Sequence, residues 1–441
     1  MTITVDKARL VEVEMDGREP YRTWKTPDHE WILEDAQTRL KMANRHAKEL
    51  FEKIKNLRPY AISLLQEIIR TPSVNNELEG EKKVAGIVVR ELQSIGFDVK
   101  TIEPYPNRVS VVGDKVFQKE KPRMLLYSHT DTVPPGDLSK WKHPPFGAVI
   151  ENGKMFGRGT LDCKTGTASS IVAARALVEL GIPLVGSISV AAAADEEAGG
   201  HKGIHELIKA NLLHGDCAIY IEALRDEIHL AANGQIWLKV TTKGEGGHTS
   251  KKKLLTNAIL KMGKVAEAFD QMEFTGWKAH PHVPGGPYIS VNRIEGGTKE
   301  NVIPDECSVI CDIRTMPGQT VQSVIADVER MLGALRNADP KLKVDAEVIN
   351  YVRPSELAPS EPIVVYTQLA AEQVIGLRPK ATGIAASTDM RWAIYDAGIP
   401  MICYSCGAPA WHVPDEYVIL EDYINTIKIL SLVTLMMLIP K

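Results

Sequence analysis

The sequence is short of cysteine, of long apolar runs and of charge of one sign, and each shortage excludes a class of protein. Six cysteines among 441 residues form neither a disulfide-stapled secreted fold nor the four-ligand pattern of a structural zinc site. The longest apolar run, 429–439, is too short to span a bilayer, and residues 1–10 lack the apolar core of a secretory signal. A net charge of −4 argues against a nucleic-acid binder. We therefore expect a cytoplasmic protein with neither nucleic acid nor membrane as a partner.

Length and periodicity predict more than one domain, because 441 residues exceed the usual size of a single hydrophobic core. Residues 1–55 are charged and are expected to form an N-terminal extension. Over 56–235, strands alternate with helices, which predicts a mostly parallel sheet flanked by helices. From 236 to 352 the predicted order is β-α-β-β-α-β, the ferredoxin-like split motif. The first pattern resumes over 353–441, so we expect an α/β fold in which an α+β lid is inserted into a discontinuous main domain.

Candidate metal ligands follow the ends of predicted strands, and the first stands after the apolar strand at 124–128. His129 comes directly off that strand, and Asp131 lies two residues later. In an open α/β sheet, ligands bind where the parallel strands run into loops. A neutral imidazole there suits a divalent metal, and a carboxylate nearby can accept the other ring N–H. The alternative is a polar turn that happens to contain a histidine.

Acidic residues supply further candidates. Asp162 follows a glycine-rich turn at the mouth of a predicted helix, where its carboxylate either bridges two cations or caps the helix. The strand at 187–194 opens into Asp195-Glu196-Glu197, three carboxylates that repel one another unless a cation neutralises them. We expect one glutamate to be a ligand and its neighbour to act as a general base. A solvated acidic turn is the alternative.

Two more strand ends complete the set of donors. The strand at 217–221 ends at Glu222, and the strand at 400–404 leads through a glycine-containing loop to His412. Together these segments offer imidazole and carboxylate groups and need no thiolate. Such a mixture of nitrogen and oxygen donors suits zinc, and also manganese or cobalt.

In this order, the segments resemble the M20 family of metallopeptidases and amidohydrolases, from about residue 60 to the C-terminus. The resemblance implies one or two divalent ions (zinc, manganese or cobalt). The implied ligands are His129, Asp162 and Glu222 for one ion, and Asp162, Glu197 and His412 for the other. It also implies that Asp131 orients His129 and that Glu196 is the general base.

The predicted lid carries its own matches to the family. The segment around His248 resembles the lid histidine that, in dimeric members, reaches the partner subunit's active site and stabilises the oxyanion. The segments 297–304 and 312–314 resemble those that supply an asparagine (Asn301) and an arginine (Arg314) to the substrate, and a guanidinium can grip a carboxylate with two hydrogen bonds. The alternatives are a solvent-facing turn for His248 and an ion pair on an edge strand for Arg314. Three lysines at 251–253 replace a proline of many relatives; they form a solvated face or attract an anionic substrate.

The resemblance implies a metal-dependent hydrolase that cleaves a C–N bond in a small carboxylate-bearing molecule, as deacylases and amidohydrolases do. It further implies a homodimer formed through the lid. Three alternatives remain open: a dipeptidase, an aromatic-amine or N-carbamoyl aminohydrolase, and an inactive small-molecule binding module. The last is disfavoured because every implied ligand and the base are present.

Overall fold

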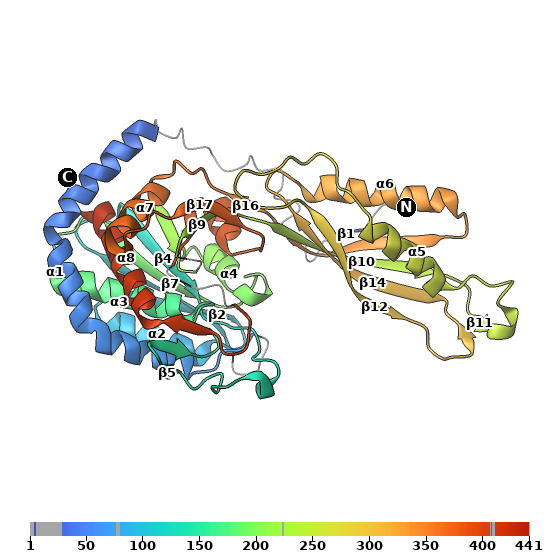
Figure 1. Cartoon of the computed structure of the whole chain (residues 1–441), viewed down its shortest axis with the longest axis horizontal. Helices are drawn as coiled ribbons and strands as arrows, with labels where there is room; N and C mark the ends of the chain where they lie inside the picture. The colour runs from blue at the N-terminus through green and yellow to red at the C-terminus, as the bar shows by residue number, and fades with distance from the viewer. Residues whose placement is uncertain are drawn as a thin grey trace. The chain divides into compact units, whose positions relative to one another are not determined.

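The computed structural model describes residues 4–5, 29–75, 80–222, 225–405, 407 and 411–440. The chain divides into two compact units. The larger unit comprises residues 21–230, 357–382 and 388–441, and the smaller unit comprises 1–20, 231–356 and 383–387. The predicted inserted domain, 236–352, lies within the smaller unit. Figure 1 labels the helices and strands of both units.

The larger unit is built on a mixed sheet whose strands follow the order β9-β18-β8-β4-β7-β3-β2. Their bounds are β2 (Asp98–Tyr105), β3 (Arg108–Val116), β4 (Arg123–His129), β7 (Ser187–Ala193), β8 (Cys217–Tyr220), β9 (Glu227–Ala232) and β18 (Met401–Cys403). The four central strands, β18, β8, β4 and β7, run parallel, and the outer strands pair antiparallel. Nearly every residue of β4 and β7 is buried, because a parallel strand covered on both faces requires a continuous apolar run.

Helices cover this sheet, and the remaining strands of the unit form small additions. The helices are α1 (His29–Ile69), α2 (Lys82–Ser94), α3 (Lys164–Leu180), α4 (Ile204–Lys209), α7 (Pro362–Ile375) and α8 (Leu420–Leu438). A three-stranded sheet contains β5 (Val149–Glu151), β6 (Lys154–Phe156) and β19 (Tyr417–Ile419). β17 (Lys380–Ile384) pairs with β9. Among the described residues, no helix combines the length and the apolar content needed to cross a bilayer.

Helix α1 crosses a predicted domain boundary. The helix begins at His29, so the predicted domain boundary at residue 55 falls inside it. A buried stripe (Ala36, Ala43, Leu50, Ile54) continues through this part at helical spacing and packs against α3, α7 and α8. Arg39 also donates through its Nη1 atom to the carbonyl of Met436 at 3.0 Å. Residues 29–55 of the predicted extension are therefore integral to the larger unit.

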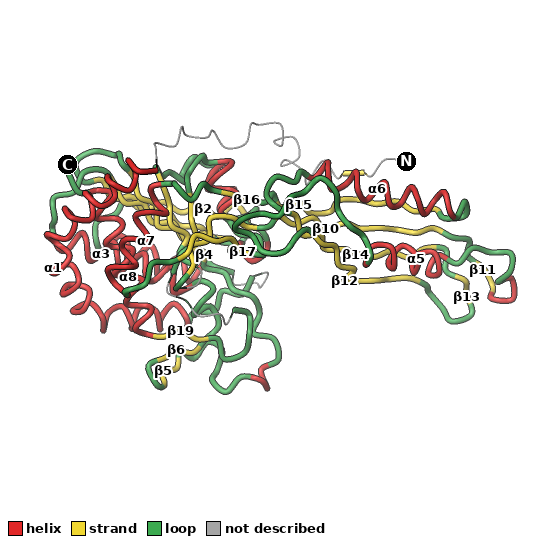
Figure 2. The backbone as a smooth tube through the Cα atoms, turned by 45° about the horizontal axis from the view of Figure 1, so that its top comes forward, coloured by secondary structure: helices red, strands yellow, loops and turns green. Residues whose placement is uncertain are grey.

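The smaller unit has the ferredoxin-like arrangement that the sequence predicts. Its elements are β1 (Thr4–Val5), β10 (Gly234–Lys243), β11 (Gly247–His248), α5 (Ala258–Asp270), β12 (Tyr288–Gly296), β13 (Val302–Ile303), β14 (Glu306–Thr315), α6 (Val321–Ala338), β15 (Lys343–Val352) and β16 (Ser355–Glu356). The sheet order is β1-β15-β10-β14-β12, and the last four strands pair antiparallel. Figure 2 shows this sheet with α5 and α6 beside it.

Local sequence explains why α5 forms and which face it buries. The Asn257 side chain caps the helix by accepting the backbone N–H groups of Ile259 and Leu260. Met262, Val265 and Phe269 follow at helical spacing and enter the core of the unit, which they share with the inward side chains of β10, β14 and β15. The unit therefore has a continuous apolar core of its own.

Candidate metal centre

The predicted ligand residues of the larger unit converge where its parallel strands end. His129 is the last residue of β4, Glu197 lies on the turn after β7, and Glu222 follows β8. Asp162 directly precedes Cys163, the N-cap of α3, and His412 lies on the loop before β19. The crossovers of an α/β sheet bring these loops to one edge, which is where such folds bind ligands.

Asp162 stands between the two histidines. Its Oδ1 atom lies 2.8 Å from Nε2 of His129, and its Oδ2 atom lies 3.0 Å from Nε2 of His412. Oε2 of Glu197 lies 3.3 Å from the same nitrogen of His412, and Oε2 of Glu222 lies 3.9 Å from Nε2 of His129. One carboxylate thus presents an oxygen to each of two donor groups, which is the arrangement that a bridging ligand requires.

The carboxylates of this centre are held under conditions that a cation would relieve. Burial, with the nearby charge of Asp162, raises the pKa of Glu222 to about 8 and that of Glu197 to about 7. Oε2 of Glu222 is buried and accepts no hydrogen bond among the described residues. Hydrogen bonds to Asp162 and Glu197 raise the pKa of His412 to about 10. This nitrogen and oxygen donor set, with an unsatisfied buried acceptor, fits a divalent metal.

Asp131 makes the contacts that an orienting residue needs. Nδ1 of His129 lies 3.0 Å from the backbone carbonyl of Asp131 and 3.3 Å from its Oδ1 atom. The Asp131 carboxylate also accepts the backbone N–H groups of Glu196 and Glu197, both at 3.1 Å. Nδ2 of Asn75 donates to it at 2.6 Å. No local pattern selects Asn75 in the sequence, because its role depends on a contact across the fold.

Glu196 differs from its neighbour Glu197 because, among the described residues, its carboxylate forms no hydrogen bond or ion pair with a candidate metal ligand. Glu197 contacts His412 and accepts the backbone N–H of Val133 at 3.1 Å, whereas no hydrogen bond to the Glu196 carboxylate is found within the described ranges. Burial raises the pKa of Glu196 well above its usual range, and the positive charge of His129 offsets this only in part. A carboxylate that is buried, unliganded and reluctant to ionise has the properties of a general base and acid.

A second buried carboxylate, Glu416, holds the loop that carries Asp162. It forms an ion pair with Arg158 at 2.6 Å, with both side chains almost fully buried. Its two oxygens also accept the backbone N–H groups of Gly159, Leu161 and Asp162, at 3.2, 2.8 and 3.3 Å. An acid four residues after His412 was visible in the sequence, but its partners were not.

Cys163 lies in the same region. Its Sγ atom and the donor atoms of His129 and Glu222 form a further group of three possible metal ligands.

In the smaller unit, the structure brings His248 and Asn301 together. β11 and β13 pair with His248 opposite Val302, and the backbone N–H of Thr249 donates to the carbonyl of Asn301 at 3.2 Å. Nδ1 of His248 accepts the backbone N–H of Ser250 at 3.3 Å. This contact leaves the proton of a neutral ring on Nε2, where it can donate a hydrogen bond.

Arg314 lies elsewhere in the smaller unit. Along β10 and β14, Gln235 pairs with Arg314 at one end, and Lys243 pairs with Glu306 at the other. The strand between Glu306 and Arg314 spans about 27 Å at roughly 3.4 Å per residue. His248 and Asn301 belong to the Glu306 end, because His248 is on β11, labelled in Figure 1, and Asn301 directly precedes β13, the strand that pairs with β11.

The Arg314 side chain is already paired. Its Nε atom lies 3.0 Å from Oδ1 of Asp312, and its Nη2 atom donates to Oδ2 of the same residue at 3.0 Å. Gln235 donates to that carboxylate as well, at 3.1 Å. The alternative of an ion pair for Arg314 is therefore observed. It lies on β14, which is an interior strand and not an edge strand.

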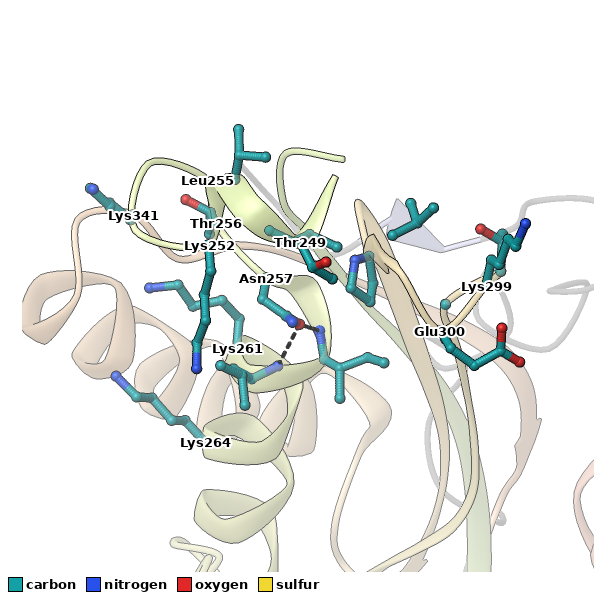
Figure 3. A pocket seen from close by; sticks show the side chains of 18 residues that line it. Thr249, Lys252, Leu255, Thr256, Asn257, Lys261, Lys264, Lys299, Glu300 and Lys341 are labelled. Carbon is teal, nitrogen blue, oxygen red and sulfur yellow. Dashed lines mark hydrogen bonds between the residues drawn. The ribbon is translucent and has the colours of Figure 1, made fainter. Parts of the chain in front are cut away.

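A hollow of about 770 Å³ opens on the smaller unit beside the start of α5. Its lining includes Thr249, Glu300 and Val302, which adjoin His248 and Asn301. Five lysines also line it: Lys252, Lys261, Lys264, Lys299 and Lys341. Figure 3 shows four of them on one side of the hollow, with Lys299 and Glu300 on the other. Asp339 neutralises Lys261 and Lys264 in part, so the hollow remains basic.

The model for peptidase family M20/M25/M40 matches residues 125–435, which include all of the candidate ligands. The chain belongs to this family. The M20 resemblance that the sequence indicated is therefore confirmed, and so is the α/β fold with a central parallel sheet flanked by helices.

Relatives of the M20 family cover most of the chain. It is 29% identical, over 383 residues, to succinyl-diaminopimelate desuccinylase from Methylobacterium nodulans, covering 82% of this chain and 92% of that protein. An M20 family metallo-carboxypeptidase from Sulfolobus solfataricus has a similar structure, with a TM-score of 0.71, 19% identity and coverage of 86% and 98% of the two chains. A di-peptidase from Saccharomyces cerevisiae has a TM-score of 0.71 at 16% identity, with coverage of 88% and 98%.

M20 membership establishes the class of reaction that the sequence predicted. The protein is a metal-dependent hydrolase that acts on amide-type C–N bonds. One or two divalent ions agree with the two groups of donor residues found there, and Asp162 contacts the histidine of each group.

Proposed function

We propose that the protein removes an acyl group from the nitrogen of a small carboxylate-bearing substrate. One ion would be held by His129, Asp162 and Glu222, and the other by Asp162, Glu197 and His412. The observation that carries this proposal is the position of Asp162, whose two oxygens face the two histidines at 2.8 and 3.0 Å. Zinc, manganese and cobalt all suit this donor set.

When bound, the ions lower the pKa of a coordinated water and polarise the amide carbonyl of the substrate. Glu196 takes a proton from the attacking water and delivers it to the departing nitrogen, because its carboxylate is buried and has no ligand role. Asp131 keeps the ring of His129 in the tautomer whose Nε2 faces Asp162. The N–H at Nε2 of His248 stabilises the negative charge that develops on the carbonyl oxygen.

Two observations support an anionic substrate. The relative that shares 29% of its residues with this chain is named for removing a succinyl group from diaminopimelate, and that substrate bears carboxylates. The basic hollow next to His248 and Asn301 would attract such a molecule to the smaller unit. We propose that Asn301 and Arg314 contact the substrate, and that Arg314 does so with the guanidinium N–H groups that Asp312 leaves available.

A homodimer would reconcile the positions of the lid residues. His248 lies at the Glu306 end of β14 and Arg314 near the other end, and about 27 Å of strand separates Glu306 from Arg314. A small substrate cannot contact both residues of one chain at that separation. It can contact both if one chain supplies Arg314 and its partner supplies His248.

The surface of the smaller unit offers a place for this dimer. β12 pairs with β14 alone among the described strands, so its other edge is open. Tyr288 and Ile294 on this strand are 51% and 58% exposed, and Leu260 on the adjacent α5 is 63% exposed. We propose that a second copy covers these residues. Sedimentation of the protein, compared with a Leu260→Asp variant, tests the dimer directly.

The five described cysteines are all buried and free of disulfides. This supports a reducing compartment, and we propose the cytoplasm as the site of action.

Hydrolysis assays test the proposed reaction. Metal-free protein would be reloaded with zinc, manganese or cobalt and given N-succinyl and N-acetyl amino acids, dipeptides, N-carbamoyl amino acids and aminobenzoyl amino acids. We expect turnover of the N-acyl amino acids. Turnover of dipeptides alone would replace the deacylase proposal with the dipeptidase alternative, and turnover of the last two groups alone would favour an aminohydrolase.

A further inference from the structure

The turn that carries Glu196 and Glu197 has a positive φ at both ends. The chain enters it through Asp195, a non-glycine residue with a φ of 68°, and leaves it through Gly199 with a φ of 101°, which glycine adopts readily. The strained conformation of Asp195 persists only where surrounding contacts hold it. At the start of the turn, the Asp131 carboxylate receives the backbone N–H groups of Glu196 and Glu197.

At the end of the turn, two side chains from a distant segment hold one carbonyl. The Gly199 oxygen accepts Nε1–H of Trp392 at 3.1 Å and a guanidinium N–H of Arg391 at 2.5 Å. Both side chains are buried, with exposed fractions of 1% and 3%. They belong to the segment that begins a single π-helical turn, Trp392–Asp396, a distortion that is frequent at functional sites.

The indole itself is fixed by its neighbours. The ring of His205 stacks on that of Trp392 with centroids 4.5 Å apart, and His201 meets it edge-on at 5.2 Å. The Arg391 guanidinium lies over the same ring, 4.7 Å from a ring centre. The indole N–H is therefore held in one direction, toward Gly199.

We propose that Trp392 and Arg391 are positioning residues for Glu196. Glu197 has contacts of its own, with His412 and with the backbone of Val133. Within the described ranges no hydrogen bond reaches the Glu196 carboxylate, so its place is set by the backbone of the turn. Loosening the Gly199 carbonyl therefore displaces the proposed base and leaves the ligands in place. This inference rests on the proposed role of Glu196 as the proton carrier.

The test removes one hydrogen-bond donor and keeps the aromatic ring. In Trp392→Phe, we expect kcat for an N-succinyl amino acid to fall about fivefold, with KM and the affinity for cobalt unchanged. In the metal-free protein, the amides of residues 196–200 should exchange with deuterium about fivefold faster. Trp141→Phe is the matched control, because Nε1 of Trp141 also donates to a backbone carbonyl, that of Pro135, at 2.9 Å. The control should change neither quantity.

Each outcome decides the inference. Wild-type exchange and wild-type kcat in Trp392→Phe would overturn it, as would an equal loss of kcat and of cobalt affinity, which indicates general damage to the site. If Trp392→Phe does not fold, Arg391→Lys is measured in the same way, with the same criteria. Absence of turnover by the wild-type protein would refute the proposed function instead. The exchange rates would still test whether Trp392 stabilises the turn of residues 196–200.

Discussion

The two units of the molecule treat their charged residues in opposite ways. In the larger unit, carboxylates gather at the strand ends around His129, which is fully buried, and His412, which is half exposed, and Glu222 keeps an unsatisfied buried oxygen. In the smaller unit, the core is apolar, Arg314 is paired with Asp312, and His248 is exposed. Burying ionised acids costs folding free energy unless a cation compensates their charge. The carboxylates of the metal centre therefore destabilise the metal-free larger unit. In the proposed function, the smaller unit is a stable support for His248, Asn301 and Arg314, which act only when substrate is present.

The strongest test of this comparison removes the proposed general base, Glu196, and leaves the metal ligands unchanged. Glu196→Gln keeps the size of the side chain and removes its ability to carry a proton. We expect kcat to fall about 10²- to 10⁴-fold while the affinity for zinc stays unchanged, measured by steady-state kinetics and calorimetry. Glu52→Gln, an exposed change on α1, serves as the control. A fully active Glu196→Gln variant would exclude the proposed mechanism.

The support role of the smaller unit predicts a large effect on folding alone. Phe269 is fully buried in the apolar core of that unit. Phe269→Ala should reduce the free energy of unfolding by about 3–5 kcal/mol, because it removes a buried aromatic ring and leaves a cavity. Metal affinity at 20 °C, checked by calorimetry beside a urea titration, should not change. A matching loss of metal affinity would show that the two units are not separable in this way.

His248 tests whether the smaller unit contributes to chemistry. His248→Ala should lower kcat about 10²- to 10³-fold, as loss of an oxyanion donor does, with no change in stability. Mixing this variant with Glu196→Ala should restore part of the activity, because a mixed dimer contains one intact site if the histidine acts across subunits. Persistent inactivity of the mixture would indicate that each chain uses its own histidine.

The cost of the buried acids gives a smaller, pH-dependent effect. Burial raises the pKa of Glu222 from its ordinary value of 4.5 to about 8. The cost of ionising Glu222 therefore destabilises the metal-free protein progressively as the pH rises between these two values. Glu222→Gln should therefore raise the melting temperature of the metal-free protein by a few degrees at pH 9 and leave it unchanged at pH 4. Calorimetric melting in the presence of a chelator measures both. A lower melting temperature at pH 9 would contradict the account.

Much of the centre could be predicted because its ligands follow apolar strands. A polar residue at the end of a buried strand, such as His129 or Glu222, carries a local signal that needs no knowledge of distant contacts. The residues that hold the ligands carry no such signal. Asn75 and Trp392 act through a carboxylate and a backbone carbonyl far away in the sequence, and any residue has a carbonyl.

Two further differences have local causes. The predicted boundary at residue 55 falls inside α1, because the buried stripe of this helix begins well before it and tertiary packing carries the helix through Pro59. Asp312 and Arg314 are two residues apart on one strand and share a face, so their ion pair could have been anticipated from strand periodicity.

Calorimetric titration of the metal-free protein with zinc, in buffers of different ionisation enthalpy, tests the central claim most directly. At pH 7 we expect binding to release about three protons. His412 has a pKa of about 10 and Glu222 one of about 8, and contacts with Cys163, Asp131 and Asp162 outweigh burial and raise the pKa of His129 well above its usual range, so all three must lose a proton to bind metal. Affinity should therefore rise with pH, and Asp162→Asn should weaken binding of every ion. Zinc binding of wild-type strength in Asp162→Asn, or binding without proton release, would contradict the account.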